Sequence, residues 1–374
     1  MMPVDMVLYV KTYRHEFRPV ISMHYLKIRK IIIQFGILSF LILLQNNTFA
    51  QHIHDSLYYT TFPNALTVRV YTAKDYADFS FASTNKRYGI QYKSNAATNL
   101  GVGVTYKNLS GNFSSGFGFL NNGIEERGKT STLDFQFHFF PRNWTSDLTF
   151  LRYKGFYATP EYNPHQIPGS YYYRPDIQLT LLGLAAYRIQ NGNKFSFRSA
   201  FFQNEWIKKS SGTLLYGGAI YYQSISADDS SLIPVKLAGF FANKDFSNFH
   251  FISIGPGIGY ARTTVLKQHF YLLGSAIINA NIIFSTDKNN LTKNTLIGFE
   301  PALNFKTAAG YSGKAWNVSL SWAGNILLAK QAYVSKANTF PVSEVRLTLA
   351  KQIMLKKPVP VLSNAIDKIF GKQE

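Results

Sequence analysis

Hydrophobic and polar residues alternate one by one along much of the chain. In residues 132–139 every second position is Leu or Phe, and the positions between them hold Thr, Asp, Gln and His. The same pattern runs through 87–93, 98–107, 316–326 and 342–349. Successive side chains of a β-strand point to opposite faces of a sheet. Each of these segments therefore predicts a strand with one apolar and one polar face.

Several of the predicted strands are long. The longest candidates are 174–190, 211–226, 248–265, 268–284 and 313–329. Strands of soluble sheets usually run about 5 or 6 residues, whereas a strand that crosses a bilayer needs about 9 to 11. Aromatic residues near the strand ends also suit the two interfaces of a membrane. These features predict an all-β fold, a closed antiparallel up-and-down transmembrane β-barrel. A soluble sandwich with its polar face in water is the alternative.

The connections between the strands favour the barrel, because such barrels alternate short periplasmic turns with longer external loops. The short candidates are 94–97, 141–143, Asn191-Gly192 and 266–267, and the long ones are 108–128, 158–173, 285–293 and 330–341. The alternation continues to the end only if a further strand lies in 233–242. With that strand, and one strand in 65–82, residues 65–354 form a barrel of about 14 strands with both ends in the periplasm. The fallback is a barrel of about 12 strands.

The N-terminal region has the layout of an export signal. The basic stretch Lys27-Ile28-Arg29-Lys30 precedes an apolar run from Ile31 to Leu44, and a polar stretch then ends at Ala50. We interpret residues 1–50 as a signal peptide region with cleavage after Ala50, and Met23 would give a signal of ordinary length. Together with the barrel, this predicts a bacterial outer-membrane location. Residues 51–64 are then a periplasmic N-terminal segment or plug, and residues 355–374 are a periplasmic tail.

Composition narrows the expected partners. Aromatic residues make up 16% of the chain, with 31 Phe and 24 Tyr, and charged residues also make up 16%, which suits contact with lipid better than contact with water. The absence of cysteine excludes disulfides and thiolate chemistry. The formal charge of +19 is spread singly along the chain, so nucleic acid is not an expected partner. Outer-membrane lipid and lipopolysaccharide, and the barrel assembly machinery, are the expected partners.

A family resemblance rests on the middle of the chain. The sequence FSFRSAFFQNEWIKKSSGTLLYGGAI at 195–220 is its main part, and Gln203-Asn204-Glu205 with Lys208-Lys209-Ser210 is the most specific portion. Over roughly residues 55–355 the chain resembles an uncharacterised family of Bacteroidetes envelope proteins, the domain of unknown function DUF4421. This resemblance implies an outer-membrane location and no assigned activity.

No catalytic, cofactor or metal residue is predicted. Residues 255–259, Gly-Pro-Gly-Ile-Gly, superficially match a phosphate loop, but such a loop needs a following helix and this segment continues as strand. His52 and His54 lack the further ligands that a closed metal site needs. Asp134 and His138 share one face, but about 13 Å separates residues four apart on a strand, too far for a direct hydrogen bond.

Polar residues on the alternating strands are expected to line the lumen. Arg198, Glu205, Lys208 and Lys209 form the best cluster, either as solvated charges of a loop or as a lumenal network in which Glu205 pairs with a basic residue. The residues predicted to face the lumen are Arg87, Gln91, Lys93, Asp134, Gln136, His138, Arg198, Glu205, Lys208, Lys209, Glu344 and Arg346.

The leading functional hypothesis is an outer-membrane barrel that passes or binds small solutes, anionic ones in particular, or that serves as a structural envelope component. One alternative is an outer-membrane enzyme acting on lipid or lipopolysaccharide, which requires a Ser or Asp close to His138, His250 or His269. The other is a soluble periplasmic β-protein that binds glycans.

Overall fold

The structure is a computed structural model of the whole chain. It describes residues 54–62, 64–83, 89–107, 109–116, 123–159, 170–228, 231–241, 244–288, 293–331, 334 and 336–355. The expected signal region at 1–50, and all of the expected tail at 355–374 except Leu355, lie outside the described residues.

Most of the described chain is β-strand. The first half contains β1 Tyr59–Thr61, β2 Ala65–Ala77, β3 Phe79–Ala82, β4 Gly89–Tyr92, β5 Thr98–Tyr106, β6 Leu109–Gly116, β7 Ser131–Phe139, β8 Trp144–Ala158 and β9 Tyr172–Ile189. The second half contains β10 Glu205–Ile207, β11 Ser211–Ser226, β12 Asn248–Leu266, β13 Phe270–Lys288, β14 Lys293–Ser312, β15 Trp316–Ala329 and β16 Asn338–Met354. The helical elements are short: α2 Ile124–Arg127, α3 Arg198–Phe201 and the 3-10 helix η3 Val235–Phe240. In the described part of the chain, no helix has the length and apolar character that crossing a membrane requires.

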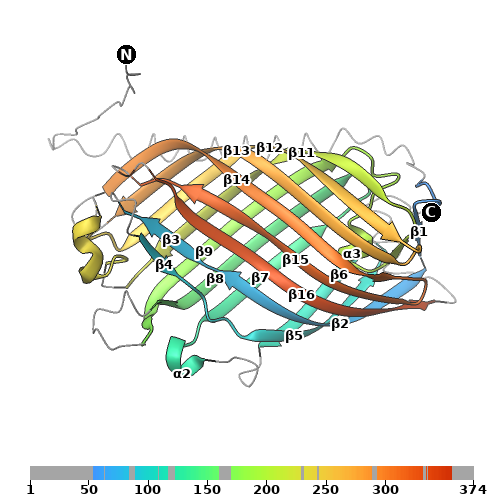
Figure 1. Cartoon of the computed structure of the whole chain (residues 1–374), viewed down its shortest axis with the longest axis horizontal. Coiled ribbons are helices and arrows are strands. Elements are labelled where there is room, and N and C mark those ends of the chain that lie inside the picture. The colour runs from blue at the N-terminus through green and yellow to red at the C-terminus, as the bar shows by residue number, and fades with distance from the viewer. Residues whose placement is uncertain are drawn as a thin grey trace, which may run out of the picture. The chain divides into compact units, whose positions relative to one another are not determined.

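The wall is one strongly curled antiparallel sheet (Figure 1). Its order is β6-β5-β2-β16-β15-β14-β13-β12-β11-β9-β8-β7, so the first long strand pairs with the last. Within the described residues no ladder joins β6 to β7. The two sides are nevertheless bridged near this seam, where Lys93 and Tyr157 exchange backbone hydrogen bonds of 2.8 and 3.0 Å. The predicted antiparallel all-β fold is confirmed, with this seam as the difference from full closure.

Two of the wall strands are interrupted opposite each other. β3 continues β2 after Asp78, and β5 continues β4 after a break that begins at Lys93. The Asp78 carboxylate accepts the backbone N–H of Ser94 at 3.0 Å, so the two breaks are bonded together. The predicted turn at 94–97 is therefore wrong, because the chain runs on along the wall and reverses between β3 and β4 instead.

The wall path has twelve strands, which is the smaller of the two expected numbers. The further strand expected in 233–242 is wrong, because this segment contains η3. Pro234 precedes that helix; its fixed φ suits a helix start and it has no N–H to give to a sheet ladder. The end of the wall where β2 begins and β16 ends is called the turn end below, because short turns join the strands there except between β9 and β11; the opposite end is called the loop end.

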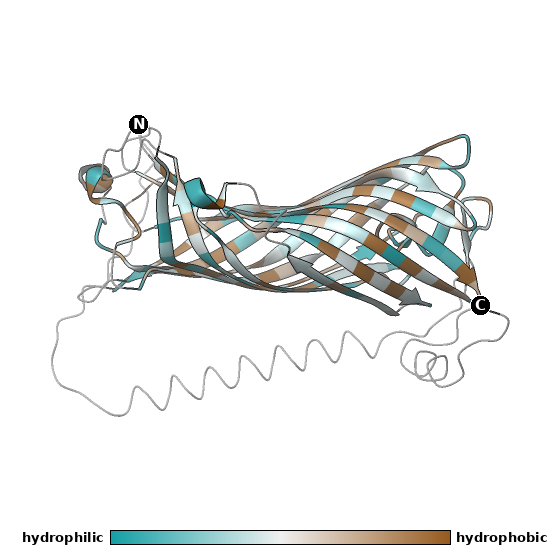
Figure 2. Cartoon of the chain, turned by 90° about the horizontal axis from the view of Figure 1, so that it is seen from below, coloured by the Kyte–Doolittle hydropathy of each residue, from teal (hydrophilic) through white to brown (hydrophobic). Residues whose placement is uncertain are grey.

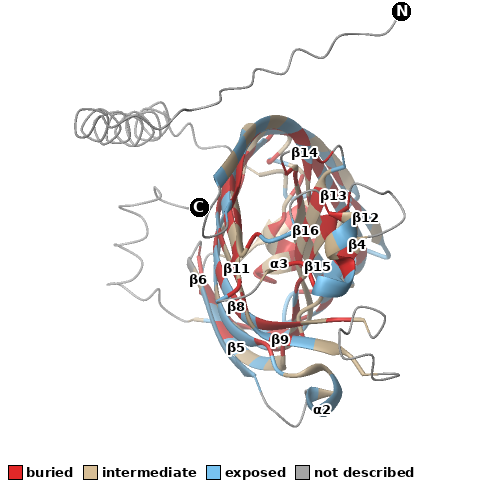
Figure 3. Ribbon diagram, turned by 90° about the vertical axis from the view of Figure 1, so that its left-hand side faces the viewer, coloured by how far each residue is buried: buried red, intermediate tan, exposed pale blue. Residues whose placement is uncertain are grey.

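The two faces of the wall differ in burial. On β13, Ile278 is 61% exposed and its neighbour Ile277 is 4% exposed, and the alternation continues along most of the strand. Figures 2 and 3 show the same change in hydropathy and burial along the other strands. The outward belt of exposed apolar side chains includes Val102, Phe135, Leu182, Ile258, Ile278, Phe299, Leu320 and Leu347.

At the loop end, buried aromatic rings fill the interior. Phe79 packs against Tyr92 and Phe156 with ring centroids 5.1 Å apart in both pairs. Phe81 lies 5.1 Å from Phe246 in the β11–β12 connection. These rings come from both sides of the curled wall, so their packing holds the two sides together.

At the turn end, the chain folds into the interior instead of forming a simple hairpin. After the turn at Asn191 and Gly192, residues 193–210 carry α3 and β10, and β10 pairs with β1. We call residues 193–210 together with β1 the plug. Gln203 anchors it, because the Gln203 carbonyl accepts bonds from Asn317 of β15 at 3.1 Å and Gln352 of β16 at 2.9 Å. Figure 3 shows α3 inside the curled sheet.

Candidate functional site

The first candidate site is a charged triad that spans the interior. Asp147 of β8 accepts a bond from Lys306 of β14, with 2.5 Å between Nζ and Oδ2. The other carboxylate oxygen lies 2.7 Å from Nδ1 of His138 on β7. Four strands separate β8 from β14 in the sheet, so this ion pair can form only across the interior.

A layer of tyrosine and asparagine side chains lies beside this triad. Asn304 of β14 donates to the Tyr221 hydroxyl at 2.6 Å and accepts from Asn279 of β13 at 2.7 Å. Tyr187 of β9 donates to Asn279 at 2.8 Å. All four side chains are buried, and they satisfy one another's polar groups. The middle of the interior is therefore polar but internally bonded.

A second cluster of charged residues lies on β2, β16 and β7. Glu344 stands directly opposite Asp75 in the β16–β2 ladder and is ion-paired with Arg346 at 2.7 Å. Asn99 donates to Asp75 at 2.8 Å. Asp134 accepts from Gln136 at 3.0 Å and from Tyr153 at 3.3 Å. Asp134 therefore has partners of its own, and His138 pairs with Asp147 instead.

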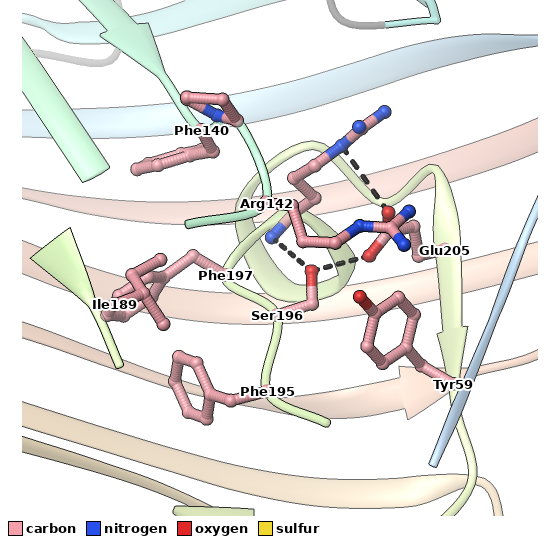
Figure 4. Close-up of a pocket in the computed structure, with 10 residues that line it drawn as sticks. Tyr59, Phe140, Arg142, Ile189, Phe195, Ser196, Phe197 and Glu205 are labelled. Atoms are coloured by element: carbon pink, nitrogen blue, oxygen red, sulfur yellow. Dashed lines mark hydrogen bonds and ion pairs between the residues drawn. The ribbon is translucent and has the colours of Figure 1, made fainter. Parts of the chain in front are cut away.

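The plug holds a third polar cluster, shown in Figure 4. Ser196 donates to Glu205 at 2.5 Å, and the backbone N–H of Arg198 donates to Ser196 at 3.1 Å. The Arg198 guanidinium is 3.5 Å from the same carboxylate, and the Arg142 side chain extends toward it in Figure 4. Glu205 is buried, and burial lowers the pKa of Arg198, which the Glu205 charge opposes. Tyr59 of β1 closes the cluster by donating to the Gly192 carbonyl at 2.8 Å.

The predicted cluster of Arg198, Glu205, Lys208 and Lys209 divides in two. Arg198 and Glu205 form the buried pair described above, whereas Lys209 is exposed and Lys208 is partly exposed. The backbone N–H groups of both lysines donate to the Tyr58 carbonyl, at 2.8 and 3.2 Å. Each of the two interpretations of this cluster therefore describes half of it.

The remaining residues of the lumen prediction are scattered. Gln91 is exposed on β4, and Lys93 is bound through its backbone to Tyr157. Arg87 lies outside the described residues. Asp134, His138, Glu344 and Arg346 belong to the charged clusters already described, and Gln136, which is exposed, donates to Asp134.

The other sequence candidates are structural. Residues 255–259 lie within β12, paired with β11 and β13, so the strand interpretation of this glycine-rich segment is confirmed. His54 stacks on Tyr59 with ring centroids 5.1 Å apart. His52 lies outside the described residues, and within the described ones no group of three metal-ligating side chains comes together.

A Ser or Asp close to His138, His250 or His269 was the feature expected of an enzyme, and it is present at His138 alone among the described contacts of these three residues. Asp147 does contact His138, but it also pairs with Lys306. His250 meets the side chain of Asn248, and His269 meets the Ser312 carbonyl rather than its hydroxyl. In the part of the chain that the structure describes, no hydroxyl group is bonded to the His138 ring. A nucleophile–base pair is therefore not assembled there.

Sequence reasoning missed Asp147, Lys306 and the asparagine–tyrosine layer. Lys306 and Asn304 occur two residues apart on β14, and Asn279 and Asn281 occur two apart on β13. That spacing places each pair on one face of its strand and is the signal that could have found them. The partner strands could not be assigned without the sheet order.

Comparisons with known proteins find one family match and several solved structures of low sequence identity. No curated protein matches the chain. Among solved structures, the outer-membrane protease OmpT from Escherichia coli is 10% identical, with a TM-score of 0.38 and coverage of 79% of this chain and 98% of that chain. The translocator domain of the autotransporter NalP from Neisseria meningitidis is 8% identical, with a TM-score of 0.32 and coverage of 77% and 88%. The COG4313 outer membrane channel from Pseudomonas putida F1 is 8% identical, with a TM-score of 0.24 and coverage of 80% and 100%.

The family match is more extensive than these likenesses. Residues 54–349 match the family described as Domain of unknown function (DUF4421). The match begins at the plug strand β1 and runs into β16, so it includes the wall, the plug and all three polar clusters. The chain belongs to the DUF4421 family.

Proposed function

We propose that this chain is an integral protein of the bacterial outer membrane. We also propose that its interior is blocked, so that the barrel is not an open pore. The observation that carries the proposal is the division of the wall into an exposed apolar face and an interior in which charged and polar side chains from opposite parts of the wall are paired. Large apolar side chains exposed on neighbouring wall strands would aggregate in water, whereas lipid covers them favourably. The expected signal peptide supports the same location.

The closed state is supported by what fills the interior. The aromatic cluster occupies the loop end, the plug occupies the turn end, and the Asp147–Lys306 ion pair joins opposite walls between them. A solute could pass only if both the plug and the loop-end aromatic cluster moved. The interior charges include Asp75, Asp147 and Glu344 as well as cations, so a preference for anions has no support from them. A structural or ligand-holding role in the envelope fits this arrangement best.

Two measurements test the proposal. Fractionation of the native host should leave the protein in the outer-membrane fraction after salt and carbonate washes, and an unheated sample should migrate differently from a boiled one in a denaturing gel. In planar bilayers, the full chain should give no steady current. A variant in which residues 194–209 are replaced by a short Gly-Ser linker, combined with Phe79→Ala, Phe81→Ala and Phe156→Ala, should conduct, because the interior then loses its filling at both ends.

Each part of the proposal can fail by itself. Release of the protein by carbonate, without detergent, would contradict the membrane location. A steady current through the full chain would contradict the closed barrel while leaving the location intact. Lack of current in the combined variant, with its gel shift preserved, would mean that the plug and the aromatic cluster are not what blocks the barrel.

The His138–Asp147 pair favours one second candidate, an outer-membrane enzyme acting on lipid or lipopolysaccharide. In many enzymes a carboxylate is hydrogen-bonded to one nitrogen of a histidine ring and so orients that histidine as a general base. Mass spectrometry of lipid A and phospholipids from cells that overproduce the chain tests this function. A modified lipid that appears with the wild-type chain and disappears with His138→Gln would establish it, and an unchanged lipid profile would exclude it.

A further inference from the structure

Positive charge is concentrated at the turn end. The connecting segments there, 54–64, 107, 140–143, 190–210, 267–269 and 313–315, contain eight Lys or Arg residues and two acidic ones. Glu205 is paired with Arg198 in the plug and Lys107 is buried, which leaves six basic residues and one acidic residue, Asp55, near the surface. The described connections at the loop end contain six basic and four acidic residues. The turn-end surface therefore attracts anions more strongly than the opposite one.

Three stacked rings organise this surface. Trp206 of the plug lies on His269 of the β12–β13 turn, and His269 lies on Tyr311 of β14; in each pair the centroids are 5.2 Å apart and the ring planes differ by 12°. The ammonium groups of Lys208 and Lys314 each lie 5.9 Å from the Trp206 ring. Rings and cations from the plug and from two turns thus form one continuous patch, which we call the turn-end basic patch.

The turn beside Trp206 is held in an uncommon backbone conformation. Lys267 and Gln268 have φ values of 50° and 59°, in the region that favours glycine. The Gln268 carbonyl accepts the Trp206 indole N–H at 2.8 Å. This turn therefore fixes the position of Trp206, and exposed Lys267 belongs to the same turn.

The patch adjoins the apolar belt. Leu266 and Phe270, on either side of the same turn, are 65% and 54% exposed, and Trp316 after the next turn is 47% exposed. Lys351 of β16 lies 5.1 Å from the Trp316 ring. A band of cations and aromatic rings directly above exposed aliphatic side chains is the arrangement found at a lipid headgroup boundary.

We propose that the turn-end basic patch binds the phosphate headgroup of acidic phospholipids in the periplasmic leaflet. This inference rests on the proposed outer-membrane location, with the turn end facing the periplasm. Lys208, Lys267 and Lys314 bind the phosphate, and Trp206 with the adjoining apolar side chains contacts the glycerol and upper acyl chains. The continuity with the apolar belt favours a lipid over a cell-wall polymer, since a polymer has no acyl chains to contact that belt.

The test uses the full chain in an uncharged detergent with short-chain phosphatidylglycerol as the probe and phosphatidylcholine as its zwitterionic counterpart. The test variant is Lys208→Gln/Lys267→Gln/Lys314→Gln. The control variant, Lys244→Gln/Lys288→Gln/Lys293→Gln, removes the same charge from exposed loop-end lysines. Each lysine near an anionic surface strengthens binding roughly fivefold, so the test variant should bind phosphatidylglycerol on the order of a hundredfold more weakly. The control variant should bind like the wild type.

Three results would overturn the inference. Equal affinity of the wild type for the two lipids would show that the charge is not used. An equal loss in both variants would show that net charge alone matters. Co-sedimentation with purified peptidoglycan that the test variant loses, without a preference for phosphatidylglycerol, would assign the patch to the cell wall. If these samples still show the heat-dependent gel shift, the barrel is intact. A negative binding result then contradicts only the lipid-binding inference and leaves the proposed membrane location standing.

Discussion

Lys306 on β14 and Asp147 on β8 are ion-paired at 2.5 Å although β9, β11, β12 and β13 lie between their strands in the sheet. Both side chains are largely buried, at 14% and 15% exposure. A contact between strands so far apart along the wall fixes the curvature of the sheet, because it joins two opposite parts of the wall directly.

Removing the lysine should therefore be costly. In Lys306→Met the Asp147 carboxylate stays in the interior without its ammonium partner, and the free energy of unfolding should fall by about 3–5 kcal/mol. The double variant Lys306→Met/Asp147→Asn should lose less, because no unpaired charge remains. Urea unfolding in lipid vesicles measures both. A loss below about 1 kcal/mol in the single variant would show that the pair is solvated and does not hold the walls.

The plug should depend on the charge of Glu205. In Glu205→Gln the buried Arg198 guanidinium loses its anionic partner, so docking of the plug should weaken by about 1.5–3 kcal/mol. Trypsin cleavage at Lys208 and Lys209 should then become on the order of tenfold faster or more, because each 1.4 kcal/mol is a factor of ten. Glu344→Gln removes an interior carboxylate outside the plug and is the matched control. Equal cleavage rates for the two variants would count against the role of Glu205.

Acid should loosen the N-terminal part of the plug. Burial, and to a smaller extent the charge of Arg142, lowers the pKa of His54 below its ordinary value. The undocked segment therefore takes up a proton near pH 6.5 while the docked segment resists it. Docking should be independent of pH above that value and weaken as the pH falls below it. Hydrogen exchange at Tyr59–Thr61 between pH 7.5 and 5 measures this, and His54→Gln should remove the dependence.

The β12–β13 turn should become more stable with glycine. Gln268 has a φ of 59°, which costs a side-chain-bearing residue about 1 kcal/mol relative to glycine. Gln268→Gly should therefore raise the free energy of unfolding by about 1 kcal/mol without changing lipid binding, since the carbonyl that accepts the Trp206 bond remains. Gln268→Ala keeps the Cβ atom and should give no gain. An equal gain in both variants would mean that the side chain, not the backbone, is responsible.

The sequence predicted the wall well because its signal is local. Alternation depends on single residues, and the outward positions Leu320, Trp322, Leu347 and Leu349 follow directly from it. The two wrong predictions about the wall concern segments in which the alternation of apolar and polar residues is weak. Ser94 lies in a break that lacks alternation, yet its backbone N–H bonds to Asp78 and the chain continues along the wall. Residues 233–242 are apolar, but Pro234 starts a short helix there.

The plug could not be predicted from alternation, because most of it lies inside the sheet and does not alternate between an inward and an outward face. Phe195, Phe197 and Phe202 are all buried, within a stretch that also holds buried Gln203 and Glu205. The sign of the plug in the sequence is a stretch dense in aromatic residues that also contains uncharged and acidic polar residues and does not alternate throughout. The pairing of His138 with Asp147 was out of reach for another reason, since it depends on the register of two strands.

The central claim is that alternate side chains of each wall strand face lipid, and the absence of cysteine allows a clean test. Ile278→Cys and Ile277→Cys are adjacent positions on β13 with opposite exposure, and each can carry a fluorescent label in vesicles. Lipids with brominated acyl chains should quench the label at position 278 strongly and the label at position 277 weakly. Equal quenching at the two positions, or stronger quenching by a water-soluble quencher at position 278, would contradict the account.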